Sequence, residues 1–333
     1  METPQHLGFI GLGAMGHPMV SNLARNLPHG SLIHVHDVNE AAMAALQTSF
    51  PNTIIPCNNA RDVASKSATI LTMLPEGHHV KSVYLDPTAG IIAALSPTST
   101  HLLIDSSTID TATSLAVKHS LSSLSPSTTF YDAPVSGGVL GARNGTVAFF
   151  LGCAPSDPNL PLLTSLLTAM GSSAIPCGGP SLGLAAKLAN NYLSAIITIA
   201  TSEAMDMGMR AGIDARVLAS VFKAGTAQNT ICDVFNPVPG VCPEAPSSRG
   251  YEGGFRVQLM RKDVTLAMDM ARRVGSRNVL GAAGLGVYAA ASESEDCKGR
   301  DSRVVYRYLG GVEEWEGRGS FLASLSVRDD AYA

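Results

Sequence analysis

A glycine-rich turn near the start of the chain limits the possible folds more than any other feature. The segment Gly11-Leu12-Gly13-Ala14-Met15-Gly16 directly follows an apolar stretch typical of a buried strand and opens an amphipathic pattern typical of a helix. A second apolar stretch, residues 32–36, then ends at Asp37. This order predicts a βαβ unit that binds a dinucleotide, because glycines let the backbone approach a pyrophosphate at the helix N-terminus.

Asp37 also indicates which dinucleotide binds. An acid at the end of the second strand can accept a hydrogen bond from the adenine ribose, whereas a 2′-phosphate there needs an arginine. Neither Val38 nor Asn39 is an arginine, so we expect NAD rather than NADP. A glycine turn that binds nothing is the alternative. The expected cofactor contacts in this region are Gly11, Leu12, Gly13, Ala14, Met15, Gly16 and Asp37.

Strand and helix patterns continue to alternate up to residue 179. Further strand patterns cover residues 69–74, 101–104, 129–131, 145–152 and 173–177. Such alternation predicts an α/β fold with a doubly wound, mostly parallel sheet and helices on both faces. Ligands bind outside the carboxyl ends of the strands in these sheets. Three motifs fall at such ends and should line one crevice with the glycine turn: Leu74-Pro75, Ser107-Thr108 and Ser136-Gly137-Gly138.

The pattern becomes helical after the Gly-Gly-Pro at 178–180. Ser181 is the expected N-cap of a long interdomain helix over about 181–210, and helical patterns continue at 214–223, 257–273 and about 279–291. We therefore expect a Rossmann domain over 1–179 and an all-helical C-terminal domain over 180–311. The tail, residues 312–333, is expected to be poorly ordered, with a short docked helix as the alternative.

The long helix carries polar side chains on one stripe. Helical spacing places Lys187, Asn190, Asn191 and Ser194 on the same face, among apolar residues that should bury the helix. An unpaired ammonium or amide is costly to bury. The stripe therefore faces either a polar ligand or an internal polar network, and the helix alone does not choose between them.

Composition excludes several classes of function. Charged residues make up 15% of the chain, the net charge is -4, and no basic run marks a nucleic-acid surface. No purely apolar stretch approaches the roughly 18 residues that span a bilayer. The six cysteines lack metal-ligand spacing, so we expect free thiols and no metal site. Few residues precede the first strand, which predicts either a cytosolic protein or a chain from which an organellar presequence is missing.

Seven separated motifs carry a family resemblance between about Leu7 and Gly310. They are Gly-Leu-Gly-Ala-Met-Gly at 11–16, Met-Leu-Pro at 73–75, Asp-Ser-Ser-Thr-Ile at 105–109, Asp-Ala-Pro-Val-Ser-Gly-Gly at 132–138, Lys-Leu-Ala-Asn-Asn at 187–191, Asn-Pro-Val-Pro-Gly-Val at 236–241 and Lys-Asp at 262–263. In this order they resemble the β-hydroxyacid dehydrogenase family. The proline-rich motif is similar to the members that act on 3-hydroxyisobutyrate.

The resemblance implies an activity and its residues. Lys187 would be the catalytic acid/base, and Ser136, Gly137, Gly138 and Asn191 would hold a small hydroxy acid. Leu74, Pro75, His79, Thr108 and Lys262 match cofactor-contacting positions. The implied reaction is NAD-dependent oxidation of 3-hydroxyisobutyrate to methylmalonate semialdehyde, a step of valine catabolism in the mitochondrial matrix. The alternatives are a related reductase of tartronate, succinic or glyoxylate semialdehydes, or a non-catalytic dinucleotide-binding scaffold.

One residue and one segment depart from the family pattern. His79 stands where the family commonly has asparagine, although an imidazole can still donate one hydrogen bond. Residues 275–291 are rich in glycine where a regular helix is expected, which puts the packing of the last helical pair in doubt.

Long buried helices also suggest a homodimer or homotetramer.

Overall fold

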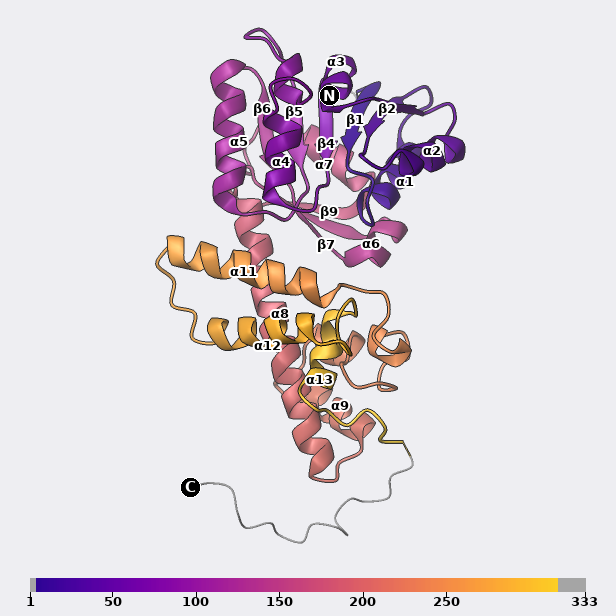
Figure 1. Ribbon diagram of the computed structural model, residues 1–333, viewed down its shortest axis with the longest axis vertical. Coiled ribbons are helices and arrows are strands. Elements are labelled where there is room, and N and C mark those ends of the chain that lie inside the picture. The colour runs from indigo at the N-terminus through magenta and orange to yellow at the C-terminus, as the bar shows by residue number, and fades with distance from the viewer. Residues whose placement is uncertain (1–3, 317–333) are drawn as a thin grey trace. The chain divides into compact units, whose positions relative to one another are not determined.

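Figure 1 shows the computed structural model of the protein, in which residues 4–316 are described. The chain divides into two compact units between Ala189 and Asn190. This division lies inside helix α8 (Leu182–Arg210), so the first two turns of one helix belong to the first unit and the rest belongs to the second.

The first unit is built on a six-stranded parallel sheet in the order β3-β2-β1-β4-β5-β6. Its strands are β1 (His6–Ile10), β2 (Leu32–His36), β3 (Ile54–Pro56), β4 (Thr69–Thr72), β5 (Leu102–Asp105) and β6 (Thr129–Asp132). The predicted doubly wound fold is confirmed. Strand order reverses between β1 and β4, and ligands of such sheets bind outside the carboxyl ends of the strands at that point. The glycine turn follows β1 at this edge.

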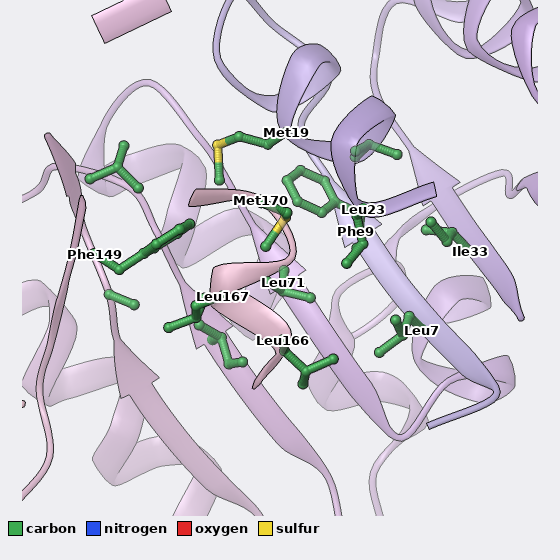
Figure 2. Packing of buried hydrophobic residues seen from close by; sticks show 14 of the residues in the cluster. Leu7, Phe9, Met19, Leu23, Ile33, Leu71, Phe149, Leu166, Leu167 and Met170 are labelled. Carbon is green, nitrogen blue, oxygen red and sulfur yellow. The ribbon is translucent and has the colours of Figure 1, made fainter. Parts of the chain in front are cut away.

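Helices cover both faces of the sheet (Figure 1). They are α1 (Gly16–Asn26), α2 (Glu40–Ser49), α3 (Ala60–Lys66), α4 (Gly77–Leu85), α5 (Thr111–Leu124) and α7 (Leu160–Thr168), with the short turn η1 (Ile91–Ala94). Alternate strand residues face opposite sides. Phe9 therefore packs in a cluster with α1, α2 and α7, part of which Figure 2 shows, whereas Ile10 packs in a second cluster with α3, α4 and α5. The core thus lies in two layers.

A smaller sheet follows the last strand of the large one. It contains β7 (Val135–Ser136), β8 (Val147–Leu151) and β9 (Gly171–Pro176), with β7 antiparallel and β9 parallel to β8. Helix α6 (Gly138–Asn144) connects β7 to β8. The sequence did not predict β7, which is only two residues long. It matters because Ser136 pairs with Ala148 and is thereby held in a sheet.

The described part of the second unit contains helices and no named strand, as predicted. The helices are the rest of α8, α9 (Ala215–Ala224), α10 (Thr230–Val234), α11 (Val257–Arg273), α12 (Gly281–Glu293) and α13 (Val305–Tyr308), with the turns η2 (Pro246–Arg249) and η3 (Ser302–Val304). An isolated bridge joins Arg256 to Asp301.

The glycine-rich segment forms a continuous helix, α12, in spite of its composition. A Cβ at Gly281 would lie 2.2 Å from Met268 Sδ, and a Cβ at Gly284 would lie 2.6 Å from Ile196 Cδ1. These distances are shorter than real carbon contacts, so neighbouring helices approach α12 closely because these two residues have no side chain. The doubt about this helical pair is therefore resolved in favour of close packing.

The proline-rich segment and the end of the described chain pack on each other. Trp315 is 9% exposed and donates from Nε1 to Pro239 O at 2.8 Å, while Tyr251 donates to Pro237 O at 2.9 Å. The Arg216 guanidinium also lies 4.8 Å from the centre of the Trp315 ring. Residues 312–316 thus differ from the poorly ordered tail that the sequence predicted. The rest of the predicted tail, residues 317–333, lies outside the described residues.

Helix α8 is long and apolar enough to cross a bilayer by length and composition alone. It also buries Lys187, Asn191, Thr198, Thr201 and Ser202 inside the protein. Core helices of soluble proteins pass the same test of length and composition. The helix is less buried than the sequence predicted, since Leu193 is 58% and Met207 is 70% exposed.

Candidate active site

The glycine turn after β1 forms an open cradle of backbone. Gly11 has φ +98°, and a Cβ there would lie 2.3 Å from Met73 O, while a Cβ at Gly16 would lie 1.8 Å from Gly11 O. These two glycines therefore close the turn. At Gly13, by contrast, no heavy atom of residues 4–316 apart from its chain neighbours lies within 4 Å of the Cβ position. The turn is thus open at Gly13, shortly before the N-terminus of α1, where an anion is favoured.

Asp37 follows β2 and holds the turn from the side. Its Oδ2 accepts a hydrogen bond from Leu12 N, and its Oδ1 accepts one from Asn39 N at 2.7 Å. A carboxylate oxygen has two lone pairs, so both oxygens can still accept from ribose hydroxyls. The cradle and this acid fit a dinucleotide with an unphosphorylated ribose, which is the chemistry of NAD.

A basic groove of about 430 Å³ continues from the glycine turn along α1. It is lined by Gly13, Ala14, His17, Pro18, Ser21, Arg25 and Arg143. Arg25 donates to Asn22 Oδ1 at 3.1 Å, which holds its head group at the surface. Sequence reasoning missed the groove, although His17, Ser21 and Arg25 recur every four residues after the turn. The arginine from α6 had no such signal.

The motifs after β4 and β5 are tied together directly. Leu74 N donates to Ser107 Oγ at 2.8 Å, and Asp105 Oδ1 accepts from Ser107 Oγ at 2.5 Å and from Thr72 Oγ1 at 2.7 Å. The predicted neighbours Pro75 and Thr108 follow these residues in the two loops. Leu74-Pro75 and Ser107-Thr108 were expected to share one edge of the sheet. The hydrogen bond from the backbone of Leu74 to the side chain of Ser107 confirms that the two loops are neighbours.

Asp105 is fully buried beneath that edge. Burial raises its pKa to about 6, against the hydrogen bonds from Ser107 and Thr72, which lower it. Thr72 Oγ1 also lies 3.0 Å from the hydroxyl of Tyr84, another fully buried residue. The two loops therefore rest on a polar network within the core. Asp105 opens the motif at 105–109, but nothing in the sequence pattern indicates its part in this network.

His79 lies in the first turn of α4 and is exposed. Its ring centre lies 3.8 Å from that of His78, whose Nδ1 lies 3.3 Å from Glu76 Oε2. The imidazole is thus accessible to a ligand, and its predicted cofactor contact stays a prediction.

The loop at Ser136 to Gly138 has a backbone that only glycine adopts readily. Gly137 has φ +134° and Gly138 has φ +63°, both outside the range that other residues favour. Successive N–H groups in such conformations can form a concavity for an anion. Gly137 is exposed and Ser136 is partly exposed, so a small ligand can reach the loop.

Lys187 lies in the second turn of α8 and is only 8% exposed. The helix start that carries it differs from the prediction in one respect. The Ser181 hydroxyl donates to Thr111 O at 3.1 Å and does not cap the helix, whereas Asp132 Oδ2 accepts from Leu184 N at 2.8 Å. The cap is therefore supplied by a residue distant in sequence, which no local pattern indicates.

Asn191 and Lys262 are brought together by Asp263 in the second unit. Asn191 Nδ2 donates to Asp263 Oδ2 at 2.6 Å, and Lys262 Nζ lies 3.2 Å from Asp263 Oδ1. Asp263 is 2% exposed. The motif at 262–263 contained this acid, but its contact with Asn191, 72 residues away in sequence, could not be read from spacing.

The described residues contain no cluster of side chains with the composition of a metal site. Across residues 4–316 no group of three or more His, Cys, Asp or Glu side chains could hold an ion, and the six cysteines are free thiols.

Comparison with known protein families matches both units. Residues 6–179 match the NAD binding domain of 6-phosphogluconate dehydrogenase, and residues 182–309 match the NAD-binding domain of NADP-dependent 3-hydroxyisobutyrate dehydrogenase. The first family thus covers the cradle, Asp37 and the Ser136 loop, and the second covers Lys187, Asn191 and Lys262.

Individual proteins are similar over almost the whole chain. A probable mitochondrial 3-hydroxyisobutyrate dehydrogenase of Dictyostelium discoideum is 37% identical, with 92% of each chain covered. An NAD-dependent L-serine dehydrogenase of Pseudomonas aeruginosa is 36% identical, covering 85% of this chain and 91% of its own. The structure of Mycobacterium tuberculosis 3-hydroxyisobutyrate dehydrogenase with L-serine superposes with a TM-score of 0.82 at 31% identity, covering 93% of this chain and 99% of that one.

The glycine cradle, Asp37 at the end of β2 and the two matching family domains lead to one conclusion. The chain belongs to the β-hydroxyacid dehydrogenase family and is an NAD-dependent oxidoreductase of that family.

Proposed function

We propose that the protein catalyses the reversible oxidation of 3-hydroxyisobutyrate to methylmalonate semialdehyde. The observation that carries this proposal is the buried amine of Lys187 in the same compact unit as the glycine-rich Ser136 loop. Similarity to the Dictyostelium discoideum protein, whose name specifies this substrate, supports the choice of acid.

The substrate carboxylate would bind to the Ser136 loop. The hydroxyl of Ser136 and the N–H groups of Gly137 and Gly138 are donors, and successive residues with positive φ angles can form a concavity for an anion. A carboxylate held at one end fixes the position of the hydroxyl carbon, and such fixed geometry can supply several kcal/mol of the barrier reduction.

Lys187 would move the proton of the substrate hydroxyl. Burial disfavours a charged ammonium, and a neutral amine is the form that can accept a proton during alcohol oxidation. In the reverse direction the protonated amine returns the proton to the carbonyl oxygen. The oxidation also needs a hydride acceptor for the hydroxyl carbon, and NAD held by the glycine turn would supply it.

The remaining residues would hold the ligands in register. Asp37 would accept from the adenine ribose, and Leu74, Pro75, His79 and Thr108 would contact the cofactor from the edge of β4 and β5. In the second unit, Asn191 would take part in substrate binding and Lys262 in cofactor binding. Asp263 would orient both, since it accepts from one and pairs with the other.

The basic groove would neutralise the cofactor diphosphate. Its lining includes Gly13 and Ala14 of the glycine turn together with Arg25 and Arg143. Guanidinium groups bind phosphate oxygens with fixed geometry and retain their charge at any physiological pH.

L-Serine is the second candidate substrate. The Pseudomonas aeruginosa relative is named for L-serine oxidation, and the Mycobacterium tuberculosis structure was determined with L-serine. Both acids carry a primary hydroxyl on the carbon next to the one that bears the carboxylate. They differ at that middle carbon, where serine has an ammonium in place of a methyl group.

A panel of hydroxy acids distinguishes these proposals. Initial rates of NADH formation would be measured with 3-hydroxyisobutyrate, L-serine, tartronate, 4-hydroxybutyrate and glycolate. We expect the highest kcat/KM for 3-hydroxyisobutyrate, because an apolar middle carbon avoids burying an ammonium. A higher kcat/KM for L-serine would show that the protein is a serine dehydrogenase. If no acid is oxidised, the alternative of a non-catalytic dinucleotide-binding scaffold would be favoured.

The protein would act as a homodimer or homotetramer in mitochondria. Exposed apolar side chains of α8 and the mitochondrial name of the Dictyostelium discoideum relative support this part of the proposal. Light scattering of the purified protein and fractionation of the source cells test the two statements separately.

A further inference from the structure

Asp132 joins the end of β6 to the start of α8. Its carboxylate accepts from Ser181 N through Oδ1 at 2.7 Å and from Leu184 N through Oδ2 at 2.8 Å. Leu184 belongs to the first turn of the helix, where backbone N–H groups have no partner within the helix, and Ser181 directly precedes that turn. Asp132 itself is 2% exposed, so these bonds are shielded from water.

Two glycines make the space that this carboxylate occupies. A Cβ at Gly152 would lie 1.8 Å from Asp132 Oδ1. A Cβ at Gly183 would lie 2.9 Å from Asp132 Oδ2 and 2.1 Å from Phe150 O. The backbone at the end of β8 and the first turn of α8 therefore enclose the carboxylate, and a side chain at Gly152 or Gly183 would conflict with it.

This arrangement does more than cap a helix. Ser181 stands at the helix start with a hydroxyl that could cap locally, yet that hydroxyl donates to Thr111 O. The cap comes from a buried carboxylate, whose burial raises its pKa while the N–H groups of Leu184 and Ser181 lower it. A buried carboxylate is a costly substitute for a local hydroxyl cap. Its distinguishing effect is to connect two distant segments.

The two connected segments carry the proposed reaction. Ser136 follows Asp132 after three residues, and Lys187 follows Leu184 after two. The strand side is rigid, since Gly152 N donates to Asp132 O at 2.7 Å and Phe150 N donates to Pro134 O at 2.9 Å. The carboxylate of Asp132 thus connects the start of the helix that carries Lys187 to the strand that leads into the Ser136 loop.

We propose that Asp132 is a positioning residue that holds Lys187 in register with the Ser136 loop, and thereby sets the turnover number of the enzyme. This inference rests on the proposed role of Lys187 as acid/base. A displacement of about 1 Å between reacting groups can cost on the order of 10²-fold in rate. Cofactor binding at the glycine turn, which is built from other residues, should not depend on this bond.

The variant Asp132→Asn tests the proposal. An amide has one oxygen, so Ser181 N or Leu184 N loses its acceptor. We expect kcat for the best hydroxy acid to fall about 10- to 100-fold, with the dissociation constant of NADH changed by less than about 2-fold. An unchanged kcat would overturn the proposal, and an equal loss of NADH affinity would replace it with a general structural role.

Asp214→Ala is the matched control. Asp214 accepts through Oδ1 from two N–H groups of a first helical turn, those of Arg216 and Val217 in α9, and alanine removes this acceptor, but the helix carries none of the proposed catalytic residues. We expect a stability loss of about 1 kcal/mol and a kcat within about 2-fold of the native value. A loss of turnover equal to that of Asp132→Asn would show that helix capping in general limits the rate.

A double-mutant cycle separates positioning from general destabilisation. If Asp132 acts through Lys187, then Asp132→Asn should lower kcat by less than about 2-fold in a Lys187→Ala background. A full 10- to 100-fold loss in that background would overturn the inference. A Lys187→Ala variant with native turnover would instead overturn the proposed function, so the two failures are distinguishable.

Hydrogen exchange on the unmodified protein covers the case in which Asp132→Asn does not fold. The amides of Ser181 and Leu184 should exchange about as slowly as those of the central strand β1, because a buried carboxylate accepts from both. The amides of Arg216 and Val217, whose acceptor is exposed, should exchange faster. Equal and rapid exchange at all four amides would contradict a fixed helix start.

Discussion

The site residues of the first unit and those of the second unit are built in different ways. At the glycine turn and the Ser136 loop of the first unit, the proposed ligand-binding groups are backbone N–H groups, and glycines such as Gly11 and Gly137 hold them in conformations that other residues avoid. In the second, the groups are side chains on two helices, held by the buried carboxylate of Asp263. The difference teaches that substitutions should act through steric conflict in the first region and through lost charge pairing in the second.

Gly11→Ala should have the largest effect, because it attacks the backbone-built region sterically. The added Cβ would lie 2.3 Å from Met73 O, at a φ of +98°. We expect NADH affinity to fall by more than about 100-fold, equivalent to about 3 kcal/mol. Fluorescence titration of NADH measures this. Gly13→Ala is the control, since its Cβ position is open among the described residues, and it should retain the fold. A normal affinity for Gly11→Ala would refute the cradle.

Asp105→Asn tests the buried carboxylate of the first unit, which accepts hydrogen bonds from two hydroxyls. Its counterpart in the second unit is Asp263, which pairs with Lys262. The folded-state pKa of Asp105 is about 6, above the ordinary 3.8. Between these values the unfolded chain binds fewer protons, so native stability falls as pH rises and the loss is complete about one pH unit above the folded-state pKa. The full loss is about 3 kcal/mol, of which about 1.4 kcal/mol falls between pH 5 and 7.5.

The asparagine variant lacks this titration. Its free energy of unfolding, relative to the native protein, should therefore rise by about 1.4 kcal/mol between pH 5 and pH 7.5. Urea unfolding at the two pH values measures the change. A difference that stays constant with pH would show that Asp105 titrates in its ordinary range.

Asp263→Asn should weaken the side-chain cluster of the second unit. The ion pair with Lys262 is lost and the bond to Asn191 becomes neutral, so we expect stability at pH 7 to fall by about 2 kcal/mol. Urea unfolding followed by circular dichroism provides the value. Asp269→Asn on the same helix breaks the exposed pair with Arg272 and should cost less than about 0.5 kcal/mol. Equal losses of stability in the two variants would mean that the buried carboxylate of Asp263 stabilises the protein no more than an exposed ion pair does.

The sequence predicted much of the fold and the backbone-built part of the site. The glycine turn and the long apolar strands have local patterns, and these elements were found where expected. Strand β7 was missed because two residues carry no periodicity, and β3 because Pro56 ends it. The caps and clusters that depend on distant residues were missed as well. Asp132 bonds to Leu184 across 52 positions, which no spacing rule detects.

Asp37→Ala should weaken cofactor binding less than Gly11→Ala does. The loss of the ribose acceptor should weaken NADH by about 10-fold and NADPH by less than about 2-fold. Parallel titrations with both cofactors make the comparison. The alanine also removes the acceptor of Leu12 N, so thermal unfolding should be checked beside the titrations. Equal weakening of both cofactors would contradict recognition of the ribose by this acid.

The central claim is that the buried amine of Lys187 transfers the proton of a small hydroxy acid bound next to NAD. The most direct test is NADH formation from 3-hydroxyisobutyrate by Lys187→Ala, measured beside NADH binding. We predict that kcat falls by about 10²-fold or more while the NADH dissociation constant stays within about 2-fold of the native value. Turnover close to that of the native enzyme would contradict the account.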